Sequence, residues 1–263
     1  MQISNKYNRF LGIAILSIAS SILFCGCPTI PEFPNEPSIS YEDVTFRIIS
    51  DTTDEGAVFS TGQIDLSLNF EDGDGDLGLA SDENNPPFHP FVFPLTDDDN
   101  LIRFGESDTL PPYSPIDYLI PLKDDTIVVS YTKFAGTDSS QFVNLLLTEN
   151  DTVYIQLNPR RNNIFVDFYY KPTNNSDFVL LDFKGPPYYQ SFDGRFPPLN
   201  TAEYDRPING TLTYSLKSVS FELLFREQPI MLEFYILDRA GNKSNVAQTN
   251  PFVLSQVKTE GSD

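Results

Sequence analysis

Three aspartates alternate with two glycines in the segment Asp72-Gly-Asp-Gly-Asp76. Carboxylate oxygens are ligands that Ca²⁺ prefers, at about 2.3–2.6 Å from the ion. On an extended strand, residues two positions apart are separated by about 6.6 Å, which is too far for their carboxylates to share one ion. Gly73 and Gly75 allow the backbone to curl, so that Asp72, Asp74 and Asp76 could meet at one centre. We expect a calcium site here; the alternative is a glycine-rich turn whose acidic side chains are only solvated.

Glu83 extends this candidate site because it is the twelfth residue when Asp72 is counted as the first. In the EF-hand, a calcium loop between two helices, the twelfth residue is a glutamate that binds the ion through both oxygens. The sixth residue of that loop is glycine, whereas this chain has Leu77, and no helical pattern flanks the segment. The sequence therefore predicts calcium bound by Asp72, Asp74, Asp76 and Glu83 in a loop that is not an EF-hand.

Side chains for nucleophilic catalysis are scarce. The chain has one histidine, His89, in a proline-rich segment, and no cysteine follows Cys27. A cysteine–histidine nucleophile and a zinc site of histidine and cysteine ligands are therefore excluded, and a serine triad would have to use His89. A pair of catalytic carboxylates, as in glycosidases, stays open because acidic residues are abundant. We expect that the protein is not an enzyme.

Alternating apolar side chains predict half-buried antiparallel strands along much of the chain. The clearest alternation is in 64–70, where one face is formed by Ile64, Leu66, Leu68 and Phe70. The same period of two recurs in 44–48, 153–157, 164–170, 212–216, 219–225 and 232–236, with a last strand near 251–254. The segment 238–243 between two such strands contains Asp, Gly and Asn, which is a hairpin signal. Seven or more short strands with no helical pattern between them predict a mainly β protein, an antiparallel β-sandwich.

Two stretches, 84–121 and 184–207, are rich in proline, aspartate and aromatic residues and show no sustained alternation. Loops of this length in a compact domain are often functional. Flat aromatic side chains suit sugar binding, and the candidates are Tyr188 and Tyr189, or Tyr169 and Tyr170 on an expected strand. Consecutive residues of a strand point to opposite faces, so at most one of Tyr169 and Tyr170 faces outward.

Residues 1–27 are organised as a bacterial signal peptide. Lys6 and Arg9 precede the apolar run 10–24, which is shorter than the roughly 20 residues that a helix needs to span a bilayer. A proline-rich segment, 28–40, follows the leader and is expected to form an extended tether.

The end of the leader, Leu23-Phe-Cys-Gly-Cys27, resembles a bacterial lipobox, in which a small residue precedes the cysteine that is acylated. Gly26 precedes Cys27, so Cys27 is the expected lipidation site, although Phe24 stands where the lipobox prefers leucine. The resemblance implies a diacylglyceryl group on Cys27, usually with a third acyl chain, and two or more chains give stable anchoring. The expected location is the outer membrane, with the periplasmic or surface face left open.

The formal net charge is −20, from 17 Lys and Arg against 37 Asp and Glu. A surface this acidic repels phosphate backbones, so we expect no nucleic-acid partner, and it attracts divalent cations. The partners that remain are the membrane, reached through the N-terminal lipid, and an envelope protein or a glycan.

Two segments at opposite ends of the expected domain, 66–79 with its Asp-Gly-Asp-Gly-Asp-Leu-Gly run and 233–245 with Asp-Arg-Ala-Gly-Asn-Lys-Ser-Asn, together resemble uncharacterised Bacteroidota-type cell-envelope lipoproteins. The resemblance implies an immunoglobulin-like β-sandwich over 41–256, with long loop insertions, the main one at about 84–160, and a flexible tail over 257–263. A division into two domains near residue 140 is the alternative.

Four Asp-Thr triplets match the O-glycosylation pattern of Bacteroidota-type envelopes, which gives Thr52, Thr109, Thr126 and Thr152 as candidate sites. Taken together, the sequence predicts a lipid-anchored binding or structural accessory protein of the cell envelope. A glycan-binding component of an outer-membrane uptake complex is the first alternative, and a carboxylate-based hydrolase is the second.

Overall fold

The computed structural model describes residues 32–52, 58–85, 87–92, 102, 118–119, 126–131, 141–146, 153–173, 175–200 and 206–259. The chain divides into two compact units, 1–32 and 33–263, and the described residues beyond Glu32 all belong to the second. The leader and Cys27 lie outside the described residues. Among the residues described, no helix is both long and apolar enough to cross a membrane.

The first sheet has three antiparallel strands in the order β1-β2-β11. Strands β1 (Ser38–Thr52) and β2 (Val58–Asp72) form a long hairpin, and β11 (Ile208–Ser218) pairs with the other edge of β2. The predicted alternation in 64–70 is confirmed, because the four apolar side chains of this segment are buried while Asp65, Ser67 and Asn69 between them are only half-buried. One face of this sheet is therefore core and the other is polar.

The second sheet has four antiparallel strands in the order β10-β9-β12-β13. Its central strands are β9 (Ile164–Tyr170) and β12 (Ile230–Ile236), flanked by β10 (Val179–Leu181) and β13 (Ala247–Gln248). Buried and half-buried residues alternate along both central strands, as their period of two predicted.

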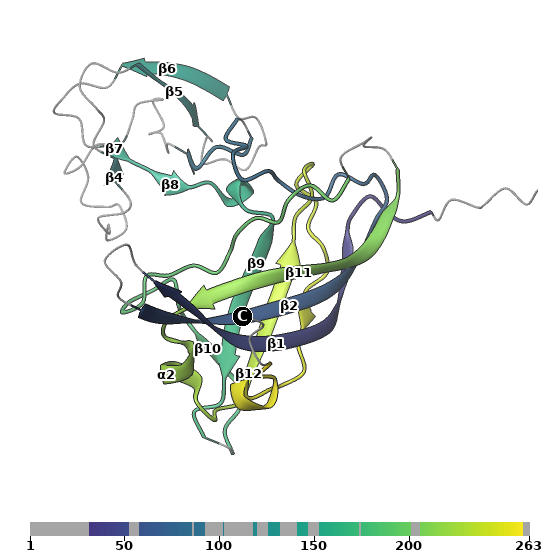
Figure 1. The fold of residues 1–263 in the computed structure, drawn as a ribbon. Coiled ribbons are helices and arrows are strands. Elements are labelled where there is room, and N and C mark those ends of the chain that lie inside the picture. Colours follow the sequence, from purple (N-terminus) through teal and green to yellow (C-terminus); the bar gives the residue numbers. More distant parts are fainter. Residues whose placement is uncertain are drawn as a thin grey trace, which may run out of the picture. The chain divides into compact units, whose positions relative to one another are not determined.

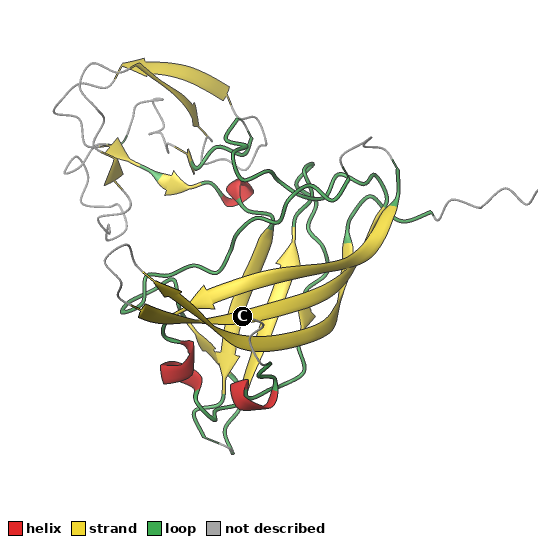
Figure 2. Cartoon of the chain, in the orientation of Figure 1, coloured by secondary structure: helices red, strands yellow, loops and turns green. Residues whose placement is uncertain are grey.

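The two sheets form two layers around one apolar core (Figure 1). Phe168 of β9 contacts four other core rings, with centroid separations from 4.8 to 5.8 Å: Phe183, Phe192, Phe221 and Phe225. The prediction of a mainly β, antiparallel β-sandwich is confirmed, and Figure 2 shows how little of the described chain is helical. The immunoglobulin-like assignment stays a prediction.

Within the part of the chain that the structure describes, three two-stranded pairs lie in the sequence between β2 and β9. They are β3 (Phe91–Val92) with β8 (Gln156–Leu157), β4 (Tyr118–Leu119) with β7 (Val153–Tyr154), and β5 (Thr126–Tyr131) with β6 (Gln141–Leu146). The 3₁₀ helix η2 (Pro159–Arg161) then leads into β9. The expected strand at 153–157 is thus two short strands. These pairs belong to neither sheet of the sandwich, and we call the region between β2 and β9 the insertion.

The predicted strand at 219–225 is wrong. Strand β11 ends at Ser218, and Phe221–Phe225 forms the short helix α2. Phe221 and Phe225 are four residues apart, so one helical face buries both rings, whereas Leu223 between them is 69% exposed.

The C-terminal part also differs from the prediction. The last strand is β13, and residues 251–254 contribute only a bridge between Phe252 and Ile230 before the 3₁₀ helix η3 (Leu254–Gln256). The expected flexible tail does not begin at 257, because Lys258 bridges Phe46 of β1 and the amide of Thr259 donates to the carbonyl of Phe46 (2.8 Å). The N-terminal tether likewise ends earlier than predicted, since β1 begins at Ser38.

Candidate metal centre

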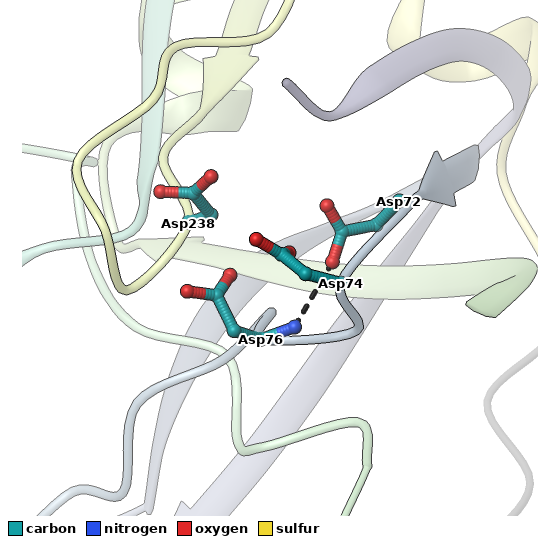
Figure 3. A group of neighbouring side chains, drawn as sticks. All are labelled: Asp72, Asp74, Asp76 and Asp238. Carbon is teal, nitrogen blue, oxygen red and sulfur yellow. Dashed lines mark hydrogen bonds between the residues drawn. The ribbon is translucent and has the colours of Figure 1, made fainter. Parts of the chain in front are cut away.

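The ends of two strands from different sheets converge on a cluster of four aspartates, Asp72, Asp74, Asp76 and Asp238 (Figure 3). Asp72 is the last residue of β2, and Asp238 follows β12 by two positions. Each residue offers one carboxylate oxygen, and these four oxygens all lie within 4.8 Å of one another. Two ligands on opposite sides of a calcium ion are about 4.6–5.2 Å apart, so the cluster has the span of one calcium shell.

The glycines between the aspartates make this curl sterically possible, as predicted. Gly75 has φ +69°, in the left-handed region that side chains with a Cβ rarely adopt, and a Cβ there would lie 2.2 Å from the carbonyl oxygen of Arg206. The turn is closed by the amide of Asp76, which donates to Oδ2 of Asp72 (3.0 Å). The three carboxylates are therefore brought to one side of the chain by local backbone geometry.

Two buried leucines hold the segment after the turn against the protein. Leu77 and Leu79 are 0% and 3% exposed, and their backbones pair with the 184–207 segment. The amide of Leu79 donates to the carbonyl of Phe196 (2.9 Å), and the carbonyl of Leu77 accepts from the amide of Leu199 (3.0 Å). The predicted long loop is thus ordered where it passes the aspartates.

Asp238 is fixed by the hairpin turn that follows β12. Asn242 donates to both of its oxygens, from the backbone amide to Oδ1 and from the side-chain amide to Oδ2, each at 2.7 Å. The amide of Asp238 donates to the carbonyl of Asn242 (3.1 Å), and Leu237 bridges Lys243. The predicted hairpin at 238–243 is confirmed, and its first residue completes the cluster.

Two oxygens of the cluster lack a donor among the described residues. Oδ1 of Asp72 and Oδ1 of Asp74 are buried and accept no hydrogen bond from the described residues. Asp72 is 0% exposed, and its neighbours in the cluster are aspartates (Figure 3). A buried carboxylate oxygen without a donor is costly unless it is protonated or bound to a cation.

The pKa shifts of the cluster also indicate that it binds a cation or protons. Burial, followed by the charges of Asp74, Asp76 and Asp238, raises the pKa of Asp72 to about 7. Burial and the same kind of repulsion raise the pKa of Asp76 to about 6, and burial also raises the pKa of Asp238. Among the ion pairs of the described residues, none involves these four aspartates. The negative charge is left for a bound cation or for protons.

Asp76 also receives two backbone donors from the opposite hairpin. The amide of Arg239 donates to its Oδ1 (3.3 Å), and the amide of Ala240 donates to its Oδ2 (3.0 Å). The β2 loop and the 238–242 turn are therefore tied together directly as well as sharing the cluster.

Comparisons with models of known protein families, with curated proteins and with solved structures find no match.

Glu83, predicted as the fourth ligand, lies outside the cluster. Its carboxylate forms an ion pair with Arg239: Nη1 donates to Oε2 (2.9 Å) and Nη2 donates to Oε1. This hydrogen-bonded pair lowers the pKa of Glu83. The structure thus brings together three of the four predicted ligands and puts Asp238 in the place expected for Glu83. Asp238 is the first residue of the hairpin predicted at 238–243, so the sequence showed an acidic residue there. Its closeness in space to 72–76 could not be predicted, because the two segments lie far apart in the chain.

The other predicted residues are dispersed. Thr52 is exposed at the end of β1 and Thr126 begins β5, while Thr109 and Thr152 lie outside the described residues. His89 is half-buried, which lowers its pKa, and its carbonyl accepts from the side chain of Asn158 (2.8 Å).

Each pair of predicted aromatic candidates has one ring against the core and one directed outward. Tyr170 packs against the core, so Tyr169 takes the outward face, as their adjacency required. Tyr188 packs on Phe183 with ring centroids 5.1 Å apart, whereas Tyr189 is 63% exposed.

Proposed function

We propose that this protein is a lipid-anchored module of a bacterial cell envelope whose β-sandwich binds calcium, and that it acts as a binding or structural accessory rather than as an enzyme. The observation that carries the calcium part is the buried, donor-less Oδ1 of Asp72 within a cluster of four carboxylates. The anchoring part rests on the lipobox-like segment that ends at Cys27.

Calcium fits the cluster better than magnesium for a reason of coordination chemistry. Ca²⁺ takes six to eight oxygen ligands in flexible geometry, and several of them are commonly carboxylates. Mg²⁺ dehydrates reluctantly and usually keeps several waters, with only one or two carboxylates bound. Four converging aspartates, with Asp72 and Asp238 buried, leave little room for a hydrated ion.

The calcium part is tested by thermal unfolding in calcium, in magnesium and in EDTA. We expect calcium to raise the melting temperature and magnesium to do so much less. Asp74→Asn should remove most of the response to calcium, because it removes a ligand charge while keeping the side-chain shape. Asp82→Asn is the matched control, since Asp82 is a nearby exposed aspartate outside the cluster. An unchanged response in Asp74→Asn would contradict the proposal.

The anchoring part is tested by labelling cells with radioactive palmitate. Wild-type protein should carry the label and Cys27→Ser should not. Cys25→Ser is the matched control, because Cys25 is the other cysteine of the chain and is preceded by bulky Phe24. Label that persists in Cys27→Ser, or that never appears on wild type, would refute anchoring at Cys27.

Glycan binding is a second candidate function, and one observation favours it. A groove of about 360 Å³ crosses the outer face of the first sheet. It is lined by the cross-strand row Ile39, Phe70 and Gly210 and by the polar rows on either side of it, Ser38–Glu71–Asn209 and Ser40–Asn69–Thr211. Hydroxyl and amide groups with a single acid suit a neutral, hydroxyl-rich ligand better than an anion, and the volume falls in the range of ligand sites.

This second candidate is tested with a panel of neutral oligosaccharides: maltohexaose, mannohexaose, xylohexaose and cellohexaose. Thr211→Lys should block the groove. Thr213→Lys is the matched control, because Thr213 lies on the same face of β11 but does not line the groove. Binding by wild type that is lost only in Thr211→Lys would support the groove. Absence of binding to the whole panel, or equal binding by both variants, would count against it.

A further inference from the structure

The backbone and the side chain of Arg239 serve different parts of the molecule. Its amide donates to Asp76 in the aspartate cluster, and Asp238, a cluster member, directly precedes it. Its guanidinium pairs with Glu83 and donates to the carbonyl of Gly78 (3.2 Å). The same residue therefore touches the proposed calcium centre and the start of the insertion.

The guanidinium and the carbonyl of Arg239 reach further into the base of the insertion, which we define as residues 87–92 and 155–161. The guanidinium carbon lies 5.0 Å from the centroid of the Phe88 ring. The carbonyl accepts from Nη2 of Arg160 (2.6 Å), and Arg160 in turn lies 5.7 Å from the same ring. Phe88 is 6% exposed, so its ring is buried beside these two arginines.

The two strands of the insertion base behave as one unit because Asn158 joins them. This buried residue donates from its side chain to the carbonyls of Pro87 (2.7 Å) and His89 (2.8 Å), and its amide donates to the carbonyl of Pro90 (3.1 Å). Contacts that fix the positions of Phe88 and Arg160 therefore also fix both strands of the insertion base.

We infer that calcium at the aspartate centre controls how firmly the base of the insertion is held, and that Arg239 is the positioning residue that couples the two. This inference rests on the proposed calcium function. Without a cation, the like charges of Asp72, Asp74, Asp76 and Asp238 repel one another and push the 238–242 turn away from the β2 loop. Because Arg239 belongs to that turn, its withdrawal weakens the contacts with Glu83, Phe88 and Arg160.

A second arginine holds the insertion base independently of the centre. Nη1 of Arg195 donates to the carbonyls of Ala80 (2.9 Å) and Glu83 (2.8 Å), and Nη2 donates to the carbonyl of Phe88 (2.9 Å). None of these contacts involves an aspartate of the cluster. Loss of calcium should therefore loosen the insertion base without releasing it, and Arg195 provides a built-in comparison for Arg239.

The coupling is tested by amide hydrogen exchange of the full domain, with calcium at about 1 mM or with EDTA, at about pH 8 so that the aspartates are ionised. In wild type we expect calcium to slow exchange in the insertion base by about tenfold, as well as in the turns 72–76 and 238–242. Arg239→Gln keeps the backbone amide that Asp76 accepts, so it should bind calcium within about threefold of wild type. It should lose most of the calcium-dependent protection of the insertion base.

Arg195→Gln is the matched control. It should speed exchange in the insertion base equally with calcium and with EDTA, because the contacts of Arg195 do not involve the aspartate cluster.

If wild type fails to bind calcium by calorimetry, the proposed function fails. If wild type binds calcium and protects the two turns, but the insertion base exchanges at the same rate with and without the ion, this inference alone is overturned. Undiminished calcium-dependent protection in Arg239→Gln would exclude Arg239 as the link, and circular dichroism of both variants checks that they are folded.

Discussion

Asp238, just beyond the end of β12, faces Asp72 at the end of β2, and both carboxylates are buried beside Asp74 and Asp76 (Figure 3). The two strands belong to different sheets, so this relationship joins the two layers of the sandwich at one edge. Like charges at the junction of two sheets oppose folding unless a cation or protons neutralise them. The predictions below follow from that conflict and from the contacts around it.

The first prediction concerns whether substituting an aspartate of the cluster raises or lowers the melting temperature, with and without calcium. Asp72→Asn removes a buried charge from a repulsive cluster, so in EDTA near pH 8 it should raise the melting temperature by about 2–4 °C. In calcium the order should reverse, because wild type gains the ion and the variant does not. Scanning calorimetry in both conditions tests this. A variant that melts below wild type in both conditions would contradict net repulsion among the four carboxylates.

The second prediction concerns pH. The pKa of Asp72 is raised to about 7 and that of Asp76 to about 6, above the ordinary value near 3.8. Between about pH 4 and pH 7 these two carboxyl groups therefore bind more protons in the folded chain than in the unfolded chain, and their contribution to the free energy of unfolding falls as the pH rises. Urea unfolding of the calcium-free protein at several pH values in this window should show that decline.

Calcium should oppose this pH dependence. The ion competes with protons for the same oxygens, so the stabilisation that calcium provides should grow as the pH rises through the same window. Asp72→Asn should flatten the calcium-free pH curve. If the calcium-free pH curve of Asp72→Asn had the same slope as that of wild type from pH 4 to pH 7, the raised pKa of Asp72 would be contradicted.

The third prediction separates the two roles considered for Glu83. If Glu83 were a calcium ligand, Glu83→Gln would weaken calcium binding severely. The structure pairs Glu83 with Arg239 instead, so calorimetry should find calcium affinity within about threefold of wild type. Loss of the charge-assisted hydrogen bonds should lower the free energy of unfolding by about 1–2 kcal/mol, with and without calcium. A loss of stability confined to calcium would restore Glu83 as a ligand.

The fourth prediction tests helix α2 in place of the expected strand. Phe225 is 1% exposed and contacts Phe168, Phe183 and Phe221, so Phe225→Ala should cost about 3–5 kcal/mol. Leu223 is 69% exposed, so Leu223→Ala should change the stability by no more than about 0.5 kcal/mol. A strand with 219, 221, 223 and 225 on one buried face would make both substitutions costly, and chemical denaturation distinguishes the two cases.

Much of the sandwich was predictable because its determinants are local. The alternation in 64–70 and 164–170 marks a half-buried strand whatever its partner, and the predicted hairpin at 238–243 needs only its own turn residues. The glycines at 73 and 75 likewise indicated that 72–76 could curl, since residues without a Cβ adopt backbone conformations that other residues rarely do.

The sequence by itself determined the strand period, the turn and three carboxylates of the cluster, because each depends on residues a few positions apart. The tertiary structure decided that Asp238 joins them, that Glu83 pairs with Arg239, and that 221–225 is helical. In 219–225, the apolar residues at every second position fit a strand, whereas Phe221 and Phe225 alone also fit the spacing of four on one helical face. In the structure both of these rings pack against Phe168. Partners far apart in the chain are chosen by how two sheets pack, and no local pattern of residues carries that information.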